Sequence, residues 1–136
     1  MTFLTRLSPG LVALLLFLLA GLAVPFPARA DALQKKCLAE AMYFEARDQG
    51  WRGMMAVGVV IQNRVADPRY PSDICSVVRQ GRYWRGSPVR HKCQFSYYCD
   101  GKHERPAEKK AWQEAADIAG ILMSTEVVMV GLENVT

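Results

Sequence analysis

The first 30 residues constrain the fold most strongly, because their composition separates them from the rest of the chain. They hold 20 of the 69 apolar residues and two basic residues, Arg6 and Arg29, but no acidic residue. The remaining 106 residues carry 15 Lys and Arg against 13 Asp and Glu, an ordinary globular composition. We therefore expect one folded domain over residues 31–136. The apolar content excludes a disordered or fibrous chain.

The acid-free segment 1–30 has the organisation of a secretory signal peptide. A basic n-region precedes an apolar h-region over residues 11–24, and residues 28–30 form a small-x-small cleavage site. An uncleaved membrane anchor is the alternative, because residues 7–24 are uncharged and approach the ~20 residues that span a bilayer. Two prolines just before the cleavage site favour cleavage. We expect an exported protein of the periplasm or cell envelope, which contacts a membrane only through this segment if it is uncleaved.

Export changes the interpretation of the four cysteines, Cys37, Cys75, Cys93 and Cys99, all of which lie after residue 30. An even number in an oxidising compartment favours two disulfides. Cys93 and Cys99 could pair with each other, which would leave Cys37 with Cys75, but all three pairings are compatible with the sequence. A zinc site is the alternative, although the spacing is not Cys-x-x-Cys and only the two histidines could complete it. We expect no metal and no cofactor.

Hydrophobic periodicity predicts a small, mainly helical domain. The expected helices cover residues 37–49, 54–65, 73–80 and 106–123, the third capped by Ser72 and the last begun by Pro106. Residues 54–65 are apolar nearly all round, which predicts a central helix buried on every side. We expect an irregular segment over residues 81–105, and a strand or loop over residues 126–132.

Glu45 stands out because it shares a helix face with apolar residues. Leu38, Ala41 and Met42 precede it at the spacing that places all four side chains on the inward face. Loss of hydration there raises the pKa of a carboxyl, and a general acid needs such a pKa to keep its proton near neutral pH. The alternative is a Glu at the edge of the stripe, in an ion pair with a basic residue such as Arg47.

Four segments form an ordered set of motifs along the chain. They are CLAEAMYFEAR at residues 37–47, AVGVVIQNRV at 56–65, YPSDICSVV at 70–78 and CQFSYYCDG at 93–101. Together they resemble the cell wall hydrolase family that includes the spore cortex-lytic enzymes. The resemblance implies a lysozyme-like, lytic-transglycosylase-like helical domain with a long disulfide-pinned loop. Such a domain cleaves the β-1,4 bond between N-acetylmuramic acid and N-acetylglucosamine in peptidoglycan.

The resemblance places Glu45 at the position of the family's catalytic acid. In a lytic transglycosylase the sugar's own 6-hydroxyl is the nucleophile, so one acid suffices, whereas a hydrolase normally uses two carboxyl groups. The possible partners Asp48, Asp73 and Asp100 lie in no recognisable second-acid motif. We therefore favour the one-acid mechanism.

Four matched residues are substrate-binding candidates: Tyr43, Gln94, Phe95 and Ser96. A Gln-aromatic-Ser loop between two cysteines is suited to hydrogen bonding with an N-acetyl group and to stacking on a sugar ring. Phe95 could equally be a core residue. Tyr43 points away from Glu45 along the helix, so it either lines the rim of the cleft or packs.

Residues 82–105 combine six Lys and Arg and two acids with five aromatic residues. Grooves for single-stranded nucleic acid have the same pattern, but export argues against a nucleic-acid partner. Peptidoglycan offers carboxylates on its stem peptides and apolar sugar faces instead. We expect a monomer whose partner is the peptidoglycan glycan strand, with a merely solvated basic loop as the alternative.

Two features depart from the family pattern. Asp48-Gln49-Gly50 stands where Gly-Glu-Pro is common, so Gln49 replaces an acid. The chain also ends at Thr136 before the family's C-terminal segment rich in Gly, Ala, His and Tyr, so we expect the catalytic domain to be truncated. The alternative functions are an N-acetylmuramoyl-L-alanine amidase, which would usually need zinc, and a non-catalytic peptidoglycan-binding module.

Overall fold

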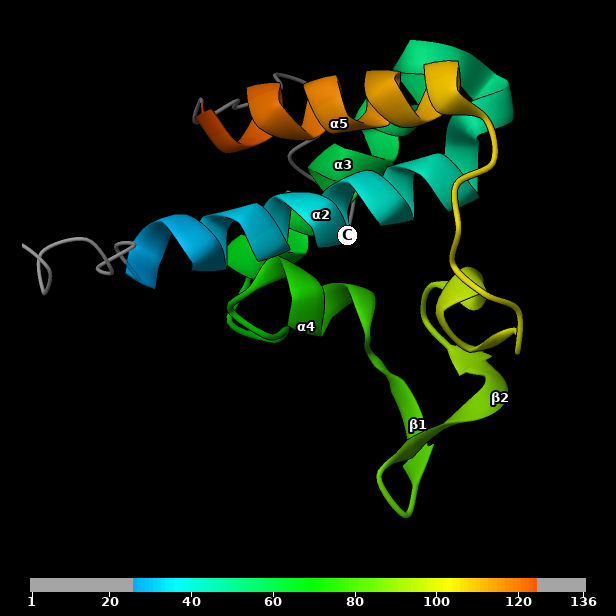
Figure 1. Cartoon of the computed structure of the whole chain (residues 1–136). Helices are drawn as coiled ribbons and strands as arrows, with labels where there is room; N and C mark the ends of the chain where they lie inside the picture. The colour runs from blue at the N-terminus through cyan, green and yellow to red at the C-terminus, as the bar shows by residue number, and fades with distance from the viewer. Residues whose placement is uncertain (1–25, 125–136) are drawn as a thin grey trace, which may run out of the picture.

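The computed structural model describes residues 26–124, with the side chains of residues 30–124. This part of the chain is mainly helical with one small sheet (Figure 1), which confirms the predicted fold class. Its elements are α2 (Phe26–Ala46), η2 (Arg47–Gln49), α3 (Gly50–Ala66), α4 (Ile74–Val78), β1 (Gly81–Trp84), β2 (Ser87–Cys93), η3 (Ser96–Cys99) and α5 (Lys109–Ser124). The expected strand or loop over residues 126–132 lies outside the described residues.

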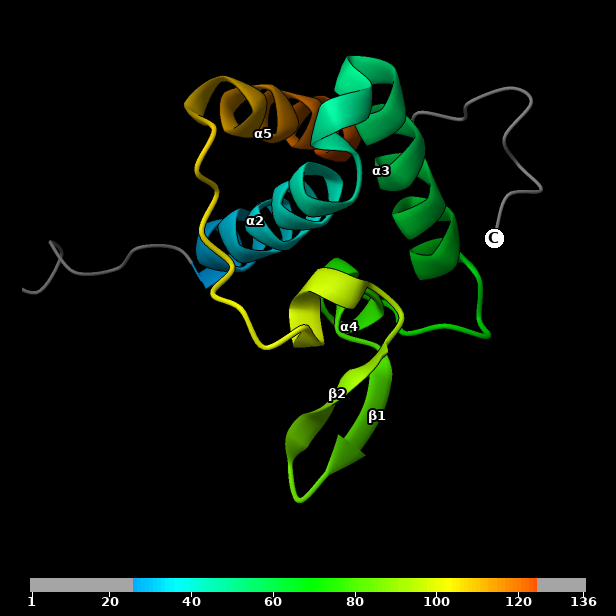
Figure 2. The same cartoon turned by 90° about the vertical axis from the view of Figure 1, so that its right-hand side faces the viewer.

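Helix α2 lies between α5 on one side and α4 on the other, and it also contacts α3 (Figures 1 and 2). Leu38, Ala41 and Met42 are fully buried because the inward stripe of α2 meets all three helices. The helix begins before the expected residue 37 and runs through the small-x-small site at residues 28–30. Cleavage there stays a prediction. No described helix is long and apolar enough to cross a membrane.

Helix α3 is buried on one side only, not on every side as its composition suggested. Met54, Met55, Gly58, Val59 and Ile61 are its buried residues. Gly58 allows the close approach of α3 to its neighbours, because a Cβ there would collide with the Leu122 side chain of α5 and lie 2.8 Å from the Met42 Sδ of α2. The opposite side of α3 is apolar but partly open to solvent.

Helix α4 is shorter than expected and is capped by Asp73, not by Ser72. The Asp73 Oδ1 accepts a hydrogen bond from the Ser76 N–H at 2.9 Å. A disulfide joins Cys75 in this helix to Cys37 in α2, with 5.3 Å between their Cα atoms. The short helix is therefore tied to the centre of the domain.

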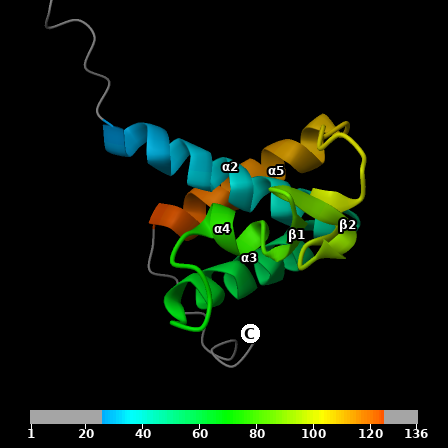
Figure 3. The same cartoon turned by 90° about the horizontal axis from the view of Figure 1, so that it is seen from below.

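Residues 81–105 are not wholly irregular, because they contain an antiparallel hairpin of β1 and β2 followed by η3. Tyr83 pairs with Pro88 and Trp84 with Ser87, and an irregularity follows before Gly81 pairs with Cys93. The hairpin projects away from the helices, on the same side of α2 as α4 (Figures 1 and 2), and it overlaps them in the view from below (Figure 3). The Cys93–Cys99 disulfide joins the end of β2 to η3, so the pairing that the sequence left open is Cys37–Cys75 and Cys93–Cys99.

Candidate functional site

Glu45 lies in a shallow hollow of about 270 Å³ where α2, α3 and the segment before η3 meet. We call this hollow the Glu45 groove. The residues that line it are Glu45, Ala56, Val57, Val60, Arg64, Gln94 and Phe95. The four α3 residues follow the spacing i, i+1, i+4 and i+8, which places them on one side of the helix. The outward apolar side of α3 therefore forms a wall of the groove.

The Glu45 carboxyl is held in conditions that favour its protonated form. The side chain is half-buried, and burial raises the pKa of the carboxyl above its ordinary value of 4.5. A hydrogen bond from the Ser96 backbone N–H offsets part of this rise. The Glu45 Oε1 is buried and has no hydrogen-bond partner. This carboxyl can therefore keep a proton at a pH where an exposed Glu would have lost it.

Arg64 lines the same groove, and it also holds an atom without a hydrogen-bond partner. Its guanidinium carbon lies 5.4 Å from the ring centroid of Tyr70 and 5.9 Å from that of Phe95, so aromatic faces hold the cation in place. Its Nε is buried without a hydrogen-bond partner. Within residues 30–124, Glu45 Oε1 and Arg64 Nε are the only buried side-chain nitrogen or oxygen atoms in this condition. Buried polar groups are usually paired, so two unpartnered atoms on residues that line one groove indicate a place for a ligand.

Three of the predicted substrate-binding residues come together beside Glu45. Gln94 is exposed at the groove, and its backbone N–H donates to the Gln80 carbonyl at 2.8 Å. Phe95 is 7% exposed, so it is both a core residue and part of the groove lining. Ser96 contributes its backbone N–H to Glu45, while its side chain is exposed. Contact of these residues with a substrate stays a prediction.

Tyr43 lies away from the Glu45 groove. Its side chain is 2% exposed, and its hydroxyl accepts hydrogen bonds from the backbone N–H groups of Ala107 and Glu108 at 3.1 and 3.0 Å. These two residues immediately precede α5, so Tyr43 fixes the start of that helix on α2. Tyr43 therefore packs, and it also lines the second hollow described next, so its contact with a substrate stays a prediction.

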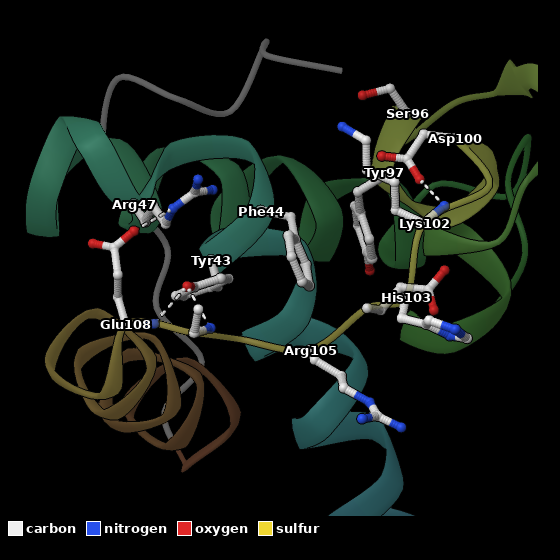
Figure 4. Close-up of a pocket in the computed structure, with 12 residues that line it drawn as sticks. Tyr43, Phe44, Arg47, Ser96, Tyr97, Asp100, Lys102, His103, Arg105 and Glu108 are labelled. Atoms are coloured by element: carbon white, nitrogen blue, oxygen red, sulfur yellow. Dashed lines mark hydrogen bonds and ion pairs between the residues drawn. The ribbon is translucent and has the colours of Figure 1, made fainter.

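A second hollow of about 330 Å³ has Ser96 in its lining (Figure 4). Phe44 and Tyr97 stack in its wall with 4.8 Å between ring centroids. Three of its charged groups are used within the protein, since Arg47 Nε donates to Glu108 Oε1 at 2.9 Å and Asp100 Oδ1 accepts from the Lys102 backbone N–H at 2.7 Å. This hollow is larger than the Glu45 groove, but its lining contains no carboxyl with a buried, unpartnered oxygen.

The three acids considered as partners for Glu45 all lie outside its groove. Asp73 caps α4, and its hydrogen bonds from Ser76 keep the pKa of this carboxyl below its ordinary value. Asp100 belongs to the second hollow, and Asp48 is exposed in η2. No group of three or more His, Cys, Asp and Glu side chains in the described part of the chain is arranged to hold a metal ion.

Sequence reasoning did not select the α3 residues of the groove. Arg64 was not chosen as a site residue, and Val57 and Val60 were assigned to a helix buried all round. One signal could have identified them. A helix that is apolar on every side but ends in Asn63-Arg64 either lies wholly in a core or lines a cleft with one side.

The comparisons agree with the motif resemblance. A family model described as Cell Wall Hydrolase matches residues 48–129, which is more than half of the chain. The match includes every residue that lines the groove except Glu45, which lies just before its start. Comparison with curated proteins and with solved structures gives no match.

Proposed function

The chain belongs to the cell wall hydrolase family, and on that premise we propose that it cleaves the glycan strand of peptidoglycan as a lytic transglycosylase. The bond broken is the β-1,4 link between N-acetylmuramic acid and N-acetylglucosamine, and Glu45 is the proton donor. The observation that carries the proposal is that Glu45 and Arg64 line one groove and that each holds a buried polar atom without a hydrogen-bond partner, Oε1 and Nε. A sugar bound in the groove would lie against both side chains.

The first step is proton donation. Burial raises the pKa of Glu45 and so favours its protonated form, whose proton passes to the glycosidic oxygen as the bond from that oxygen to C1 of N-acetylmuramic acid breaks. The N-acetylglucosamine residue leaves with a free 4-hydroxyl. The Glu45 carboxylate that remains lies close to the positive charge that develops at C1, and the Ser96 N–H stabilises this carboxylate.

The second step closes a ring within the sugar. The Glu45 carboxylate accepts the proton of the 6-hydroxyl of N-acetylmuramic acid while O6 attacks C1. The product is a 1,6-anhydro sugar, and Glu45 is again protonated for the next cycle. One carboxyl is sufficient for both steps, which agrees with a groove whose described lining contains no acid other than Glu45.

The other groove residues position the sugar. The Arg64 guanidinium lines the groove and is a charged donor for a carbonyl or carboxylate oxygen of a sugar substituent. Gln94 is exposed for hydrogen bonding to an N-acetyl group, and Val57 and Val60 offer an apolar surface to a sugar ring face. We further propose that the protein acts in the cell envelope after export by its N-terminal signal.

The test is a digest of purified peptidoglycan analysed by mass spectrometry. We expect anhydro-muropeptides from the unmodified protein, and a loss of about 10²–10⁴-fold in rate for Glu45→Gln, because the amide has the same shape but no acidic proton. Glu40→Gln is the matched control. Glu40 lies on the same helix but pairs with Lys36 at 3.5 Å outside the groove, so its amide variant should keep the rate.

Other products would identify the alternatives. Reducing sugar ends would indicate a muramidase, and freed stem peptides an amidase. No product from the unmodified protein, with binding retained, would indicate a non-catalytic binding module. Full cleavage by Glu45→Gln would refute the assignment of the proton donor.

A further inference from the structure

The hairpin carries positive charge only. Residues 81–93 include Arg82, Arg85, Arg90 and Lys92 but no Asp or Glu. Arg90 is used within the protein, since its Nε donates to the Asp100 carbonyl at 3.1 Å. No side chain within residues 30–124 forms an ion pair with any of the four. Three exposed cations on one arm are therefore left without an acidic partner in the described structure.

The tip of the hairpin exposes an aromatic ring and a strained arginine. Trp84 is 70% exposed, more than any other large apolar side chain described, and the Arg85 guanidinium lies 5.8 Å from its ring centroid. Arg85 and Gly86 have φ values of 48° and 80°, as the two central residues of a type I′ turn require. Asn or Gly is preferred at the first of these positions, and Arg is strained there. Packing explains neither Trp84 nor Arg85.

The base of the hairpin is fixed to the Glu45 groove. Strand β2 runs directly into Gln94 and Phe95, which line the groove, and the Cys93–Cys99 disulfide pins this junction. On the other strand, the Tyr83 hydroxyl donates to the Arg79 carbonyl at 2.8 Å. Strand β2 extends over about 20 Å, at ~3.4 Å per residue. A polymer lying in the groove would therefore have the base of the basic arm beside it.

We propose that the hairpin binds the carboxylate-bearing stem peptides of peptidoglycan and holds the glycan strand at the groove. This proposal rests on the proposed function, because it takes the groove as the place of the glycan strand. Charge complementarity selects the ligand, since Arg82, Arg85 and Lys92 face solvent and the stems carry carboxylates. An anionic lipid surface is a weaker match, because one tryptophan supplies little apolar area for insertion and the charges follow the whole arm.

The test measures binding, separately from cleavage. The full chain carrying Glu45→Gln is sedimented with purified insoluble peptidoglycan, and the bound fraction gives an apparent Kd. We expect each cation removed to weaken binding roughly two- to fivefold, so the triple variant Arg82→Gln, Arg85→Asn, Lys92→Gln weakens it most. Arg85→Asn alone is the decisive variant. It creates the Asn-Gly pair that type I′ turns prefer, so any loss of binding cannot come from an unfolded hairpin.

The matched control is the triple variant Arg52→Gln, Lys109→Gln, Lys110→Gln, which removes the same charge from exposed residues outside the hairpin. This control variant should bind intact peptidoglycan as tightly as its parent, Glu45→Gln, does. The parent should bind peptidoglycan stripped of stem peptides only weakly, with an apparent Kd like that of the hairpin triple variant on intact peptidoglycan. Equal losses in both triples would overturn the proposal, as would unchanged binding by the hairpin triple. Hairpin-dependent binding to phosphatidylglycerol vesicles but not to peptidoglycan would replace it with a lipid surface. Failure of the proposed function appears instead in the muropeptide digest, which this measurement does not use.

Discussion

The two disulfides should rank differently in their effects on stability and on activity. Cys37–Cys75 should contribute more to stability, and Cys93–Cys99 more to activity. Cys37–Cys75 closes a loop with a sequence separation of 38, and Cys93–Cys99 closes one with a separation of 6. The loop entropy removed from the unfolded chain corresponds to about 4 kcal/mol for the first and about 2 kcal/mol for the second at 25 °C. We therefore expect the double variant Cys37→Ala, Cys75→Ala to lose about 2 kcal/mol more of its free energy of unfolding.

Activity should follow the other order. Gln94 and Phe95 lie inside the Cys93–Cys99 loop and line the Glu45 groove, whereas Cys37 and Cys75 are buried between α2 and α4, outside it. Under conditions where both double variants remain folded, Cys93→Ala, Cys99→Ala should release more peptidoglycan fragments than Glu45→Gln but fewer than Cys37→Ala, Cys75→Ala.

Urea unfolding followed by tryptophan fluorescence measures the first quantity, and the release of soluble fragments from peptidoglycan measures the second. The Cys-to-Ala pairs serve as controls for each other, because each removes two sulfurs. A larger loss of stability from the short loop would refute the loop-entropy argument. Undiminished cleavage by the variant that lacks Cys93–Cys99 would refute the role of this loop in shaping the groove.

Two further predictions concern α2. Tyr43→Phe should lower the free energy of unfolding in urea by about 1 kcal/mol, because it keeps the ring but leaves the Ala107 and Glu108 N–H groups without their acceptor. An unchanged free energy of unfolding would mean that water replaces the hydroxyl. Because burial raises the pKa of Glu45, its stabilising contribution is complete below pH 4.5 and is lost as the pH rises through the raised value. The urea concentration at the unfolding midpoint should therefore be higher for Glu45→Gln than for the unmodified protein at pH 8, and similar for the two at pH 4. A lower midpoint for Glu45→Gln at pH 8 would contradict this.

The position of Glu45 was predictable because it depends on local geometry. A residue seven positions after Leu38 on one helix must share its face, so the inward direction of the carboxyl follows from the helical repeat. The structure adds the cause of the raised pKa, which is burial against residues of α3 and of the segment before η3. Those neighbours are distant in sequence, so no local pattern identifies them.

The hairpin was not predictable for a related reason. Strand prediction relies on alternation between buried and exposed side chains, but every residue of β1 is exposed and β2 is at most partly buried. Without a buried face the sequence of these strands carries no period of two. The turn also lacks its usual sequence signal. Arg85 has a positive φ and precedes Gly86, at a position where Asn or Asp would have indicated a type I′ turn.

The sequence by itself determined the helical class, the family motifs, the number of cysteines and the acid that shares a face with the core, since each depends on residue type and short-range spacing. Only the tertiary structure decided how the cysteines pair, and which side of α3 stays open. It also decided that Glu45 and Arg64, each with a buried unpartnered atom, line one groove. The physical reason is that burial and pairing depend on which segments meet in space. In this chain the contacts that decide these features join residues of different elements, as Glu45 and Arg64 do across 19 residues.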